Sequence, residues 1–243
     1  MIYIDGREGL SGDMLVAAML ELLDPRLKKE ASSRIENAAA MHAISFSGSE
    51  IEEDGEKGLC INYRLSEPSV TGASHDSAFA QLEDFENHLD SHAPTGRLIL
   101  KAVFEAESEA HEVPVEEVHL HEIGRPQGIL NMAVIGMLSH MLLQDGGEGF
   151  VASKIVTGKG VTVMSHGAMR IPPPASRILL RGLWHEEGEA AGERATPTGI
   201  AALKVLAGSQ TDMVPVNHFI RKGVGFGSKR FGGRLGRTVL YRY

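Results

Sequence analysis

Residues 1–23 read MIYIDGREGLSGDMLVAAMLELL and predict a short strand that leads through a glycine-containing turn into a helix. Residues 2–5 have the apolar character of a buried strand. Ser11 is a typical helix N-cap residue, and apolar side chains recur at helical spacing from there to about Leu23, at Met14, Leu15, Ala18, Met19 and Leu22.

Helix-like and strand-like segments alternate along the rest of the chain, and this alternation predicts an α+β (mixed α/β) fold. A second helix is expected from about Pro25, followed by a hairpin at 43–66 that turns at 54–58. Further helices are predicted at 79–91, 96–111, 129–143, 175–182 and 198–207, and further strands at 150–157, 160–164, 213–226 and 236–243.

A loop rich in Ser, Pro, Thr and Gly is predicted at 67–78, and it is the point where the chain would divide into two lobes. Residues 1–66 would form an N-terminal α/β part. Residues 79–243 would form a helical segment and a C-terminal α/β part that holds the ligand site. A single continuous domain is the alternative.

The composition describes a soluble globular protein of 243 residues, 42% hydrophobic and 23% charged. No apolar run approaches the roughly 18 to 20 residues that span a bilayer, and the start lacks a signal sequence, so we expect a cytoplasmic protein without membrane contact. The net charge of −8 argues against a nucleic-acid partner. Cys60 lies in a strand-like run and is predicted as a small core residue rather than a reactive thiol.

Residues 111–124 read HEVPVEEVHLHEIG and concentrate metal-ligand side chains. Strand-like alternation would send the imidazoles of His119 and His121 to one face and Leu120 to the other. Imidazole nitrogens suit borderline divalent metals such as nickel or zinc, and Glu122 or a carboxylate from elsewhere could complete the shell. The alternative is a solvated polar face on an exposed strand edge.

Two helix starts offer unpaired N–H groups to an anion. At Ser11, Gly12 and Asp13, simple N-capping is the alternative role, and Asp5 with Asp13 could instead hold a metal. The second start, TPTG at 196–199, has an N-cap followed by proline, and Thr196, Thr198 and Gly199 suit a phosphate or carboxylate. His166, between Ser165 and Gly167, is a candidate ligand or proton carrier, with a structural role as the alternative.

The chain from Met213 to its end contains seven basic residues and no Asp or Glu, so this segment could face an anion. Lys229 and Arg230 are the candidate contacts. The alternating glycines at 223–227 would let the backbone approach a ligand, or would simply weaken and bend a strand. The sequence contains no nucleophile elbow, Cys-x-x-Cys pair, His-Glu-x-x-His helix or Walker loop.

Four strings in the same order resemble the LarC family of nickel-insertion proteins: 5–14 ending in GLSGDM, 113–124 as VPVEEVHLHEIG, 165–167 as SHG before a proline run, and 192–199 ending in TPTG. The resemblance runs over nearly the whole chain. It implies that nickel is delivered into a pyridinium bis-thiocarboxylate mononucleotide, with CTP consumed and magnesium or manganese assisting. The corresponding activity would be that of a lyase-type nickel chelatase.

The chain departs from the family pattern in two ways. Family members usually carry a further C-terminal domain that handles CTP, and this chain stops at Tyr243, about where that domain would begin. A separate C-terminal LarC-like polypeptide is therefore the expected partner. Gln127 and Asn131 stand where the family tends to place aspartates, which reduces the charge available to a hard cation.

Three hypotheses follow from the residues and the resemblance. In the first, a metal-insertion component binds nickel through His119, His121 and Glu122, with Asp13 and His166 as further ligands. Its substrate anion would lie at Ser11, Gly12, Thr196, Thr198, Gly199, Lys229 and Arg230. The second hypothesis is a nickel carrier or assembly subunit without turnover, and the third is a diverged paralogue that binds another phosphorylated small molecule. A homo-oligomer is compatible with all three.

Overall fold

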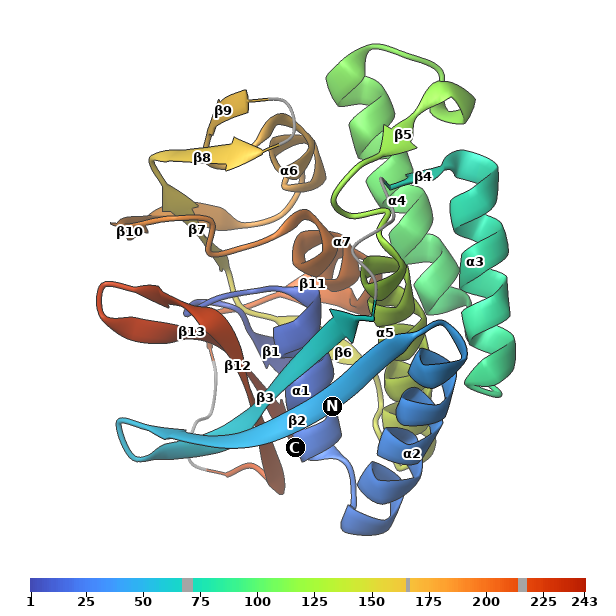
Figure 1. Ribbon diagram of the computed structural model, residues 1–243. Helices are drawn as coiled ribbons and strands as arrows, with labels where there is room; N and C mark the ends of the chain where they lie inside the picture. The colour runs from blue at the N-terminus through green and yellow to red at the C-terminus, as the bar shows by residue number, and fades with distance from the viewer. Residues whose placement is uncertain (67–71, 165–166, 214–217) are drawn as a thin grey trace.

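The computed structural model describes residues 1–66, 72–164, 167–213 and 218–243. Its main element is a mixed seven-stranded sheet in the order β11-β6-β1-β13-β12-β3-β2 (Figure 1). These strands are β1 (Ile2–Asp5), β2 (Ile44–Glu53), β3 (Glu56–Leu65), β6 (Phe150–Ala152), β11 (Ala207–Gln210), β12 (Arg221–Phe231) and β13 (Arg234–Arg242). The α+β prediction is confirmed.

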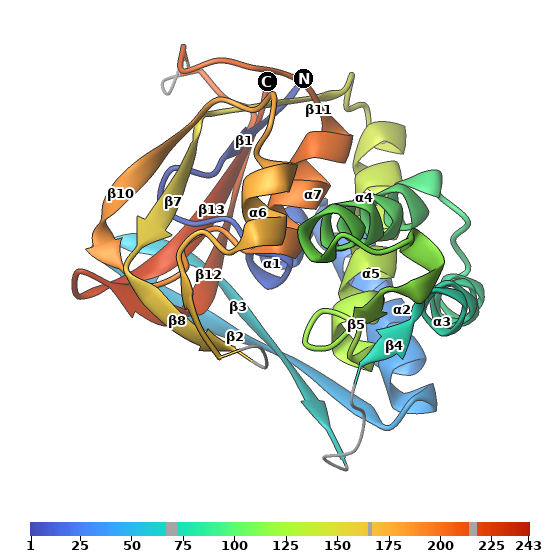
Figure 2. The same cartoon turned by 90° about the horizontal axis from the view of Figure 1, so that it is seen from above.

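The helices gather on one side of this sheet, with α1 directly against it (Figure 2). They are α1 (Gly12–Leu22), α2 (Pro25–Met41), α3 (His75–His88), α4 (Pro94–His111), α5 (Pro126–Gln144), α6 (Pro174–Leu179) and α7 (Pro197–Leu206). Three short two-stranded pairs lie outside the sheet: β4 (Ala73–Ser74) with β5 (His119–Leu120), β7 (Ile155–Lys159) with β10 (His185–Ala191), and β8 (Val161–Met164) with β9 (Gly167–Arg170).

The first 23 residues form the strand and helix that their pattern predicts, and both are central. Strand β1 pairs in parallel with β6 and antiparallel with β13, so that Ile4 lies opposite both Ala152 and Leu240. Both Ile4 and Leu240 are fully buried. Because β1 lies inside the sheet, the turn after Asp5 is held in a fixed position relative to the sheet.

Glycines in β12 let helix α1 lie unusually close to the sheet. A Cβ at Gly223 would lie 2.1 Å from the carbonyl oxygen of Ala18, and one at Gly225 would lie 1.9 Å from that of Met14. The alternating glycines therefore serve the packing of α1, and at these two positions the close approach is to a helix rather than to a ligand.

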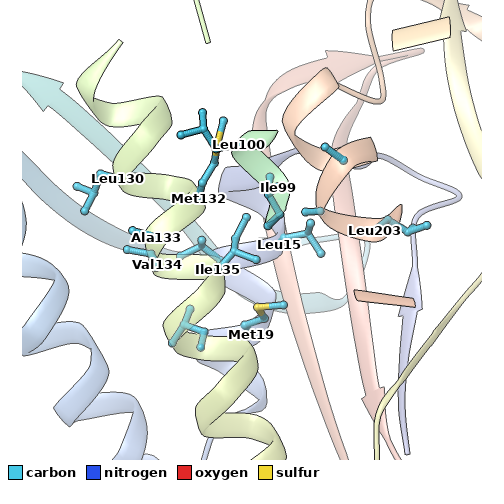
Figure 3. Close-up of a cluster of buried hydrophobic side chains, with 14 of the residues drawn as sticks. Leu15, Met19, Ile99, Leu100, Leu130, Met132, Ala133, Val134, Ile135 and Leu203 are labelled. Atoms are coloured by element: carbon cyan, nitrogen blue, oxygen red, sulfur yellow. The ribbon is translucent and has the colours of Figure 1, made fainter. Parts of the chain in front are cut away.

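A continuous hydrophobic core joins residues from before and after the predicted loop at 67–78. Figure 3 shows Leu15 and Met19 of α1 beside Ile99 of α4, with Ile135 of α5 and Leu203 of α7 in the same cluster. Each of these side chains is fully buried. Burial of this size dominates the stabilisation of the fold, at roughly 1.5–3 kcal/mol for each large aliphatic side chain.

Helix α5 is long and apolar enough to cross a membrane by length and composition, contrary to the expectation that no apolar run approaches that length. In the structure, 67% of the most apolar 18-residue stretch of this helix is buried inside the protein. It packs against α1, α3 and α4. Helix α5 thus has the surroundings of a core helix.

The predicted helices agree with the structure apart from their ends. The predicted strand at 150–157 is instead two strands, β6 and β7, which lie in different sheets. The predicted strand at 213–226 corresponds to β12, which begins at Arg221, and residues 214–217 lie outside the described residues. The hairpin of β2 and β3 has its turn at Asp54 and Gly55, which both have positive φ. Helix α3 begins at His75, inside the predicted loop, because Ser74 caps it by accepting a hydrogen bond from the Ser77 amide. Cys60 on β3 is buried, as predicted, and burial raises the pKa of its thiol.

Candidate functional site

The two predicted anion-binding helix starts lie side by side. Leu10 and Ala195 form a parallel bridge, in which the Leu10 amide donates to Arg194 O at 3.0 Å and the Thr196 amide donates to Leu10 O at 2.9 Å. This bridge places the N-termini of α1 and α7 next to each other. Both helices therefore direct their positive ends toward the same region.

Small residues permit this approach of the two helix starts. A Cβ at Gly199 would lie 2.4 Å from Leu10 O, and one at Gly12 would lie 2.5 Å from Asn131 Nδ2 and 3.1 Å from Thr198 Cγ2. Gly12 and Gly199 were predicted to be substrate contacts. The structure shows a packing reason for glycine at both positions.

Side chains at the two starts act as caps. Ser11 Oγ accepts from the Met14 amide at 3.4 Å and its hydroxyl donates to the Asp13 carboxylate. Thr196 Oγ1 accepts from the Gly199 amide at 3.3 Å. The capping roles that the sequence indicated are therefore confirmed, and Asp13 is held at the first turn of α1.

The histidine pair lies on β5 and the turn that follows it. Strand β5 pairs with β4, with His119 opposite Ser74 and Leu120 opposite Ala73. The rings of His119 and His121 have centroids 5.2 Å apart and are nearly perpendicular, at 64°. Leu120 between them is buried. The two imidazoles are neighbours, as the alternation predicts, although the regular strand ends before His121.

A cavity of about 410 Å³ brings the histidine pair and the two helix starts together. Its lining includes His119, His121 and Glu122 from β5 and the turn after it, and Asp13, Thr196 and Thr198 from the starts of α1 and α7. We call this cavity the cleft. Ser11, Gly12, Glu107, Ala110, His111, Leu120, Ile123, Gly128, Asn131, Met169, Pro173, Pro174, Ala175, Glu193 and Pro197 complete its lining.

Three lining residues with ligand side chains were not among the predicted site residues. His111 and Glu107 come from the last turn of α4, where His111 Nε2 lies 3.5 Å from Glu107 Oε2. His111 belongs to the quoted HEVPVEEVHLHEIG string, so its presence in the cluster was the available signal. Glu193 lies inside the 192–199 string that resembles the family, so its place in that string was the available signal.

Glu193 is the carboxylate with the most unusual surroundings in the cleft. Its Oε1 is buried and has no hydrogen-bond partner. Burial raises the pKa of Glu193, the positive charge of Lys229 lowers it, and the negative charge of Glu122 raises it further. A cation in the cleft would relieve the cost of burying the ionised form.

The remaining predicted residues are placed as follows. Lys229 lines a smaller adjoining cavity of about 160 Å³ together with Asp13, Glu193 and Thr196. Arg230 pairs with Glu53 at 2.5 Å and donates to Gly233 O at 2.7 Å, so its guanidinium is engaged elsewhere. His166 lies outside the described residues.

Most of the basic C-terminal segment is neutralised by acidic side chains from other elements. Lys222 pairs with Glu56, Arg237 with Glu8, and Arg242 with Asp145, in addition to Arg230 with Glu53 and Arg234 with Asp54. Asp5 likewise pairs with Arg7 at 2.6 Å. Within the described residues, Asp5 does not join Asp13 in lining the cleft.

Asn131, at one of the two positions where the family resemblance implies an aspartate, is buried on α5 against the start of α1. Its Oδ1 accepts from Tyr63 Oη at 3.5 Å. Burial and then the negative charge of Asp13 raise the pKa of Tyr63, which keeps it a hydrogen-bond donor. A neutral amide here avoids placing a buried carboxylate near the negative charge of Asp13. Gln127, one turn earlier, has a buried Oε1 without a hydrogen-bond partner.

Comparison with known proteins bears directly on this site. A profile described as nickel insertion protein matches residues 2–238. Relatives from Geobacter sp. (strain M21) and Syntrophobacter fumaroxidans (strain DSM 10017 / MPOB), both named "Putative nickel insertion protein", are 31% and 32% identical over 234 and 237 residues. The matches cover 94% and 93% of this chain but 57% and 55% of those relatives.

No solved structure matches the chain. The family profile, by contrast, spans almost all of it and agrees with the four motifs found in the sequence. The chain therefore belongs to the nickel insertion protein family.

Proposed function

We propose that this chain binds a nickel ion in the cleft and transfers it to an anionic, nucleotide-like precursor bound in the same cleft. Membership of the nickel insertion family supports nickel as the metal. The observation that carries the proposal is that imidazoles, carboxylates and the N-termini of two helices line one cavity. Such a cavity can hold a cation and an anion in contact with each other.

For the cation, His119 and His121 supply the nitrogen ligands that nickel favours. Asp13, Glu107, Glu122 and Glu193 are the carboxylates that line the same cavity. Both imidazoles and Glu122 are exposed to solvent. An exposed set of ligands suits an ion that must enter and leave, whereas structural metal sites are usually closed by four protein ligands.

For the anion, the N-termini of α1 and α7 offer N–H groups and positive dipole ends. The hydroxyls of Thr196 and Thr198 and the ammonium of Lys229 add hydrogen-bond donors. These groups suit the phosphate and carboxylates of a pyridinium bis-thiocarboxylate mononucleotide. The soft sulfur atoms of that precursor would then compete with imidazole for nickel, which gives the transfer its direction.

The chain spans little more than half the length of these relatives. We propose that a separate C-terminal polypeptide supplies the CTP-dependent step with magnesium or manganese, so that the assembled protein is a lyase-type nickel chelatase in the cytoplasm. The chain alone would then bind nickel and precursor without sustained turnover.

Calorimetric titration with NiCl₂ tests the metal half of this proposal. Untagged wild-type protein is compared with the His119→Ala/His121→Ala variant, and His140→Ala serves as the matched control because His140 is exposed on α5 outside the cleft. The double variant should lose more than the roughly tenfold in affinity that removal of a supporting partner costs. Equal nickel affinity in the double variant and the wild type would exclude this site.

A turnover assay distinguishes a protein that inserts nickel into the precursor from one that only binds and carries nickel. The isolated chain, given precursor, CTP, nickel and magnesium, should form little nickel-containing product until the C-terminal partner is added. Binding of nickel without product in the presence of that partner would instead identify a carrier. Absence of nickel from protein purified in nickel-supplemented medium would favour a diverged paralogue.

A further inference from the structure

A second group of metal-ligating side chains lies outside the cleft, between α2 and α3. His42 follows the last residue of α2, and Asp84 and His88 lie one turn apart on α3. One ligand atom from each of the three lies within 4.8 Å of the others. We propose that this group, the α2–α3 cluster, is a second site for a borderline divalent cation, Ni²⁺ or Zn²⁺.

His42 is held in place by its surroundings and presents an unsatisfied nitrogen. Its amide donates to Ala39 O and Ala40 O at the end of α2, and its ring packs on Phe85 with centroids 4.2 Å apart. Its Nε2 is buried and lies 3.1 Å from Asp84 Oδ2, but without the geometry of a hydrogen bond. A buried nitrogen beside a carboxylate oxygen, with no hydrogen bond made, is suited to a shared cation.

His88 is oriented by a backbone carbonyl. Its Nδ1 lies 2.8 Å from Asp84 O, and because a carbonyl can only accept, Nδ1 carries the proton. The lone pair is then on Nε2. Metal-binding histidines commonly donate their other ring nitrogen to a carbonyl in this way, which fixes both the tautomer and the ring orientation.

The donor set decides the class of ion. Two imidazoles and one carboxylate favour nickel, zinc or copper over calcium and magnesium, which prefer an all-oxygen shell. The His42 side chain is 18% exposed, whereas those of Asp84 and His88 are 51% and 32% exposed. Solvent can therefore reach the cluster and supply the remaining ligands. A bound ion would also join α2 to α3.

The α2–α3 cluster is distinct from the cleft. Helix α3 begins beside β4, which pairs with the histidine strand β5, and it ends at His88 (Figure 1). Its 14 residues correspond to roughly 20 Å of helix between the two places. None of the three side chains is among the described residues that line the cleft.

Titration in a variant that lacks the cleft histidines isolates this second site. In the His119→Ala/His121→Ala background, NiCl₂ and, separately, ZnCl₂ should still bind at about one ion per chain and raise the melting temperature, since an ion that binds the folded form stabilises it. Adding Asp84→Asn and His88→Ala should abolish both effects. His42 is left unchanged so that its packing on Phe85 is kept, and His92→Ala, an exposed histidine beyond α3, is the matched control.

Unchanged ion binding after Asp84→Asn and His88→Ala, with circular dichroism showing an intact fold, would overturn the proposal. So would the absence of any ion in the His119→Ala/His121→Ala background, because it would leave His42, Asp84 and His88 as an ion-paired cluster only. Neither result bears on nickel in the cleft, which is tested by the His119→Ala/His121→Ala variant itself.

Discussion

At the scale of single residues, Glu193 combines a cost to folding with a proposed role in binding nickel. Its buried Oε1 has no partner, and burial raises its pKa. Between the ordinary carboxyl pKa and this raised value, the folded protein holds a proton that the unfolded chain has lost. This proton adds to the free energy of unfolding at low pH. Its contribution is lost as the pH rises from the ordinary carboxyl pKa through the raised pKa of Glu193.

Glu193→Gln should therefore stabilise the metal-free protein at neutral pH and weaken nickel binding. Relief of the buried charge is expected to contribute about 1 kcal/mol, or roughly 2–4 °C in Tm for a chain of this size. Thermal unfolding between pH 4 and 8 should show a shallower decrease in stability with rising pH than in the wild type. Glu189→Gln, at an exposed position on β10, should change neither stability nor nickel affinity. A variant less stable than the wild type at neutral pH would contradict this account.

The placement of individual candidate residues could be predicted where a local pattern exists. The period of two at His119 and His121 placed both imidazoles together, and the N-cap residues Ser11 and Thr196 were recognisable from residue type. Glu193 carries no such pattern, because it enters the cleft through the Leu10–Ala195 bridge, a contact between distant segments. Arg230 was assigned to the anion from charge alone, yet its partner Glu53 lies on β2.

At the scale of elements, the contact between α1 and β12 fixes the position of the start of α1, which lines the cleft. Gly225 has Met14 O where a Cβ would be placed, so any larger residue must push α1 away from the sheet. Because α1 carries Ser11 and Asp13 at its start, this displacement would also alter the cleft.

Gly225→Ala should destabilise the protein by about 1–3 kcal/mol or more, the usual cost of overpacking a core. Gly208→Ala is the matched control, since a Cβ at this strand glycine meets no atom within 4 Å. Urea denaturation of the two variants gives the comparison. Equal stability of both variants would show that α1 does not lie against β12 as described.

Element boundaries were predicted best for long periodic segments and worst for short strands. Helices α1, α4, α5 and α7 agree within a few residues with their apolar spacing. Strands β10 and β11 were missed because the polar string HEEGEAA and the string AGSQ carry no strand-like alternation of buried side chains, and their pairing partners are distant in sequence.

At the scale of the whole molecule, the sheet and its helices bring segments from across the chain into one cleft. Its lining comes from the starts of α1, α5, α6 and α7, the end of α4, and strands β5 and β9. Periodicity predicts the helices among these elements separately. It does not predict that they lie around one cleft, because that arrangement depends on long-range pairing. The resemblance of four collinear motifs to a family supplied that information indirectly.

The most direct test of the central claim is the position of nickel in crystals of the untagged chain, measured by anomalous diffraction at the nickel absorption edge. The cleft site predicts a peak at about 2.1 Å from an imidazole nitrogen of both His119 and His121, the usual length of a metal–imidazole bond. Fully occupied nickel elsewhere on the molecule, with no peak between these two histidines, would contradict the account.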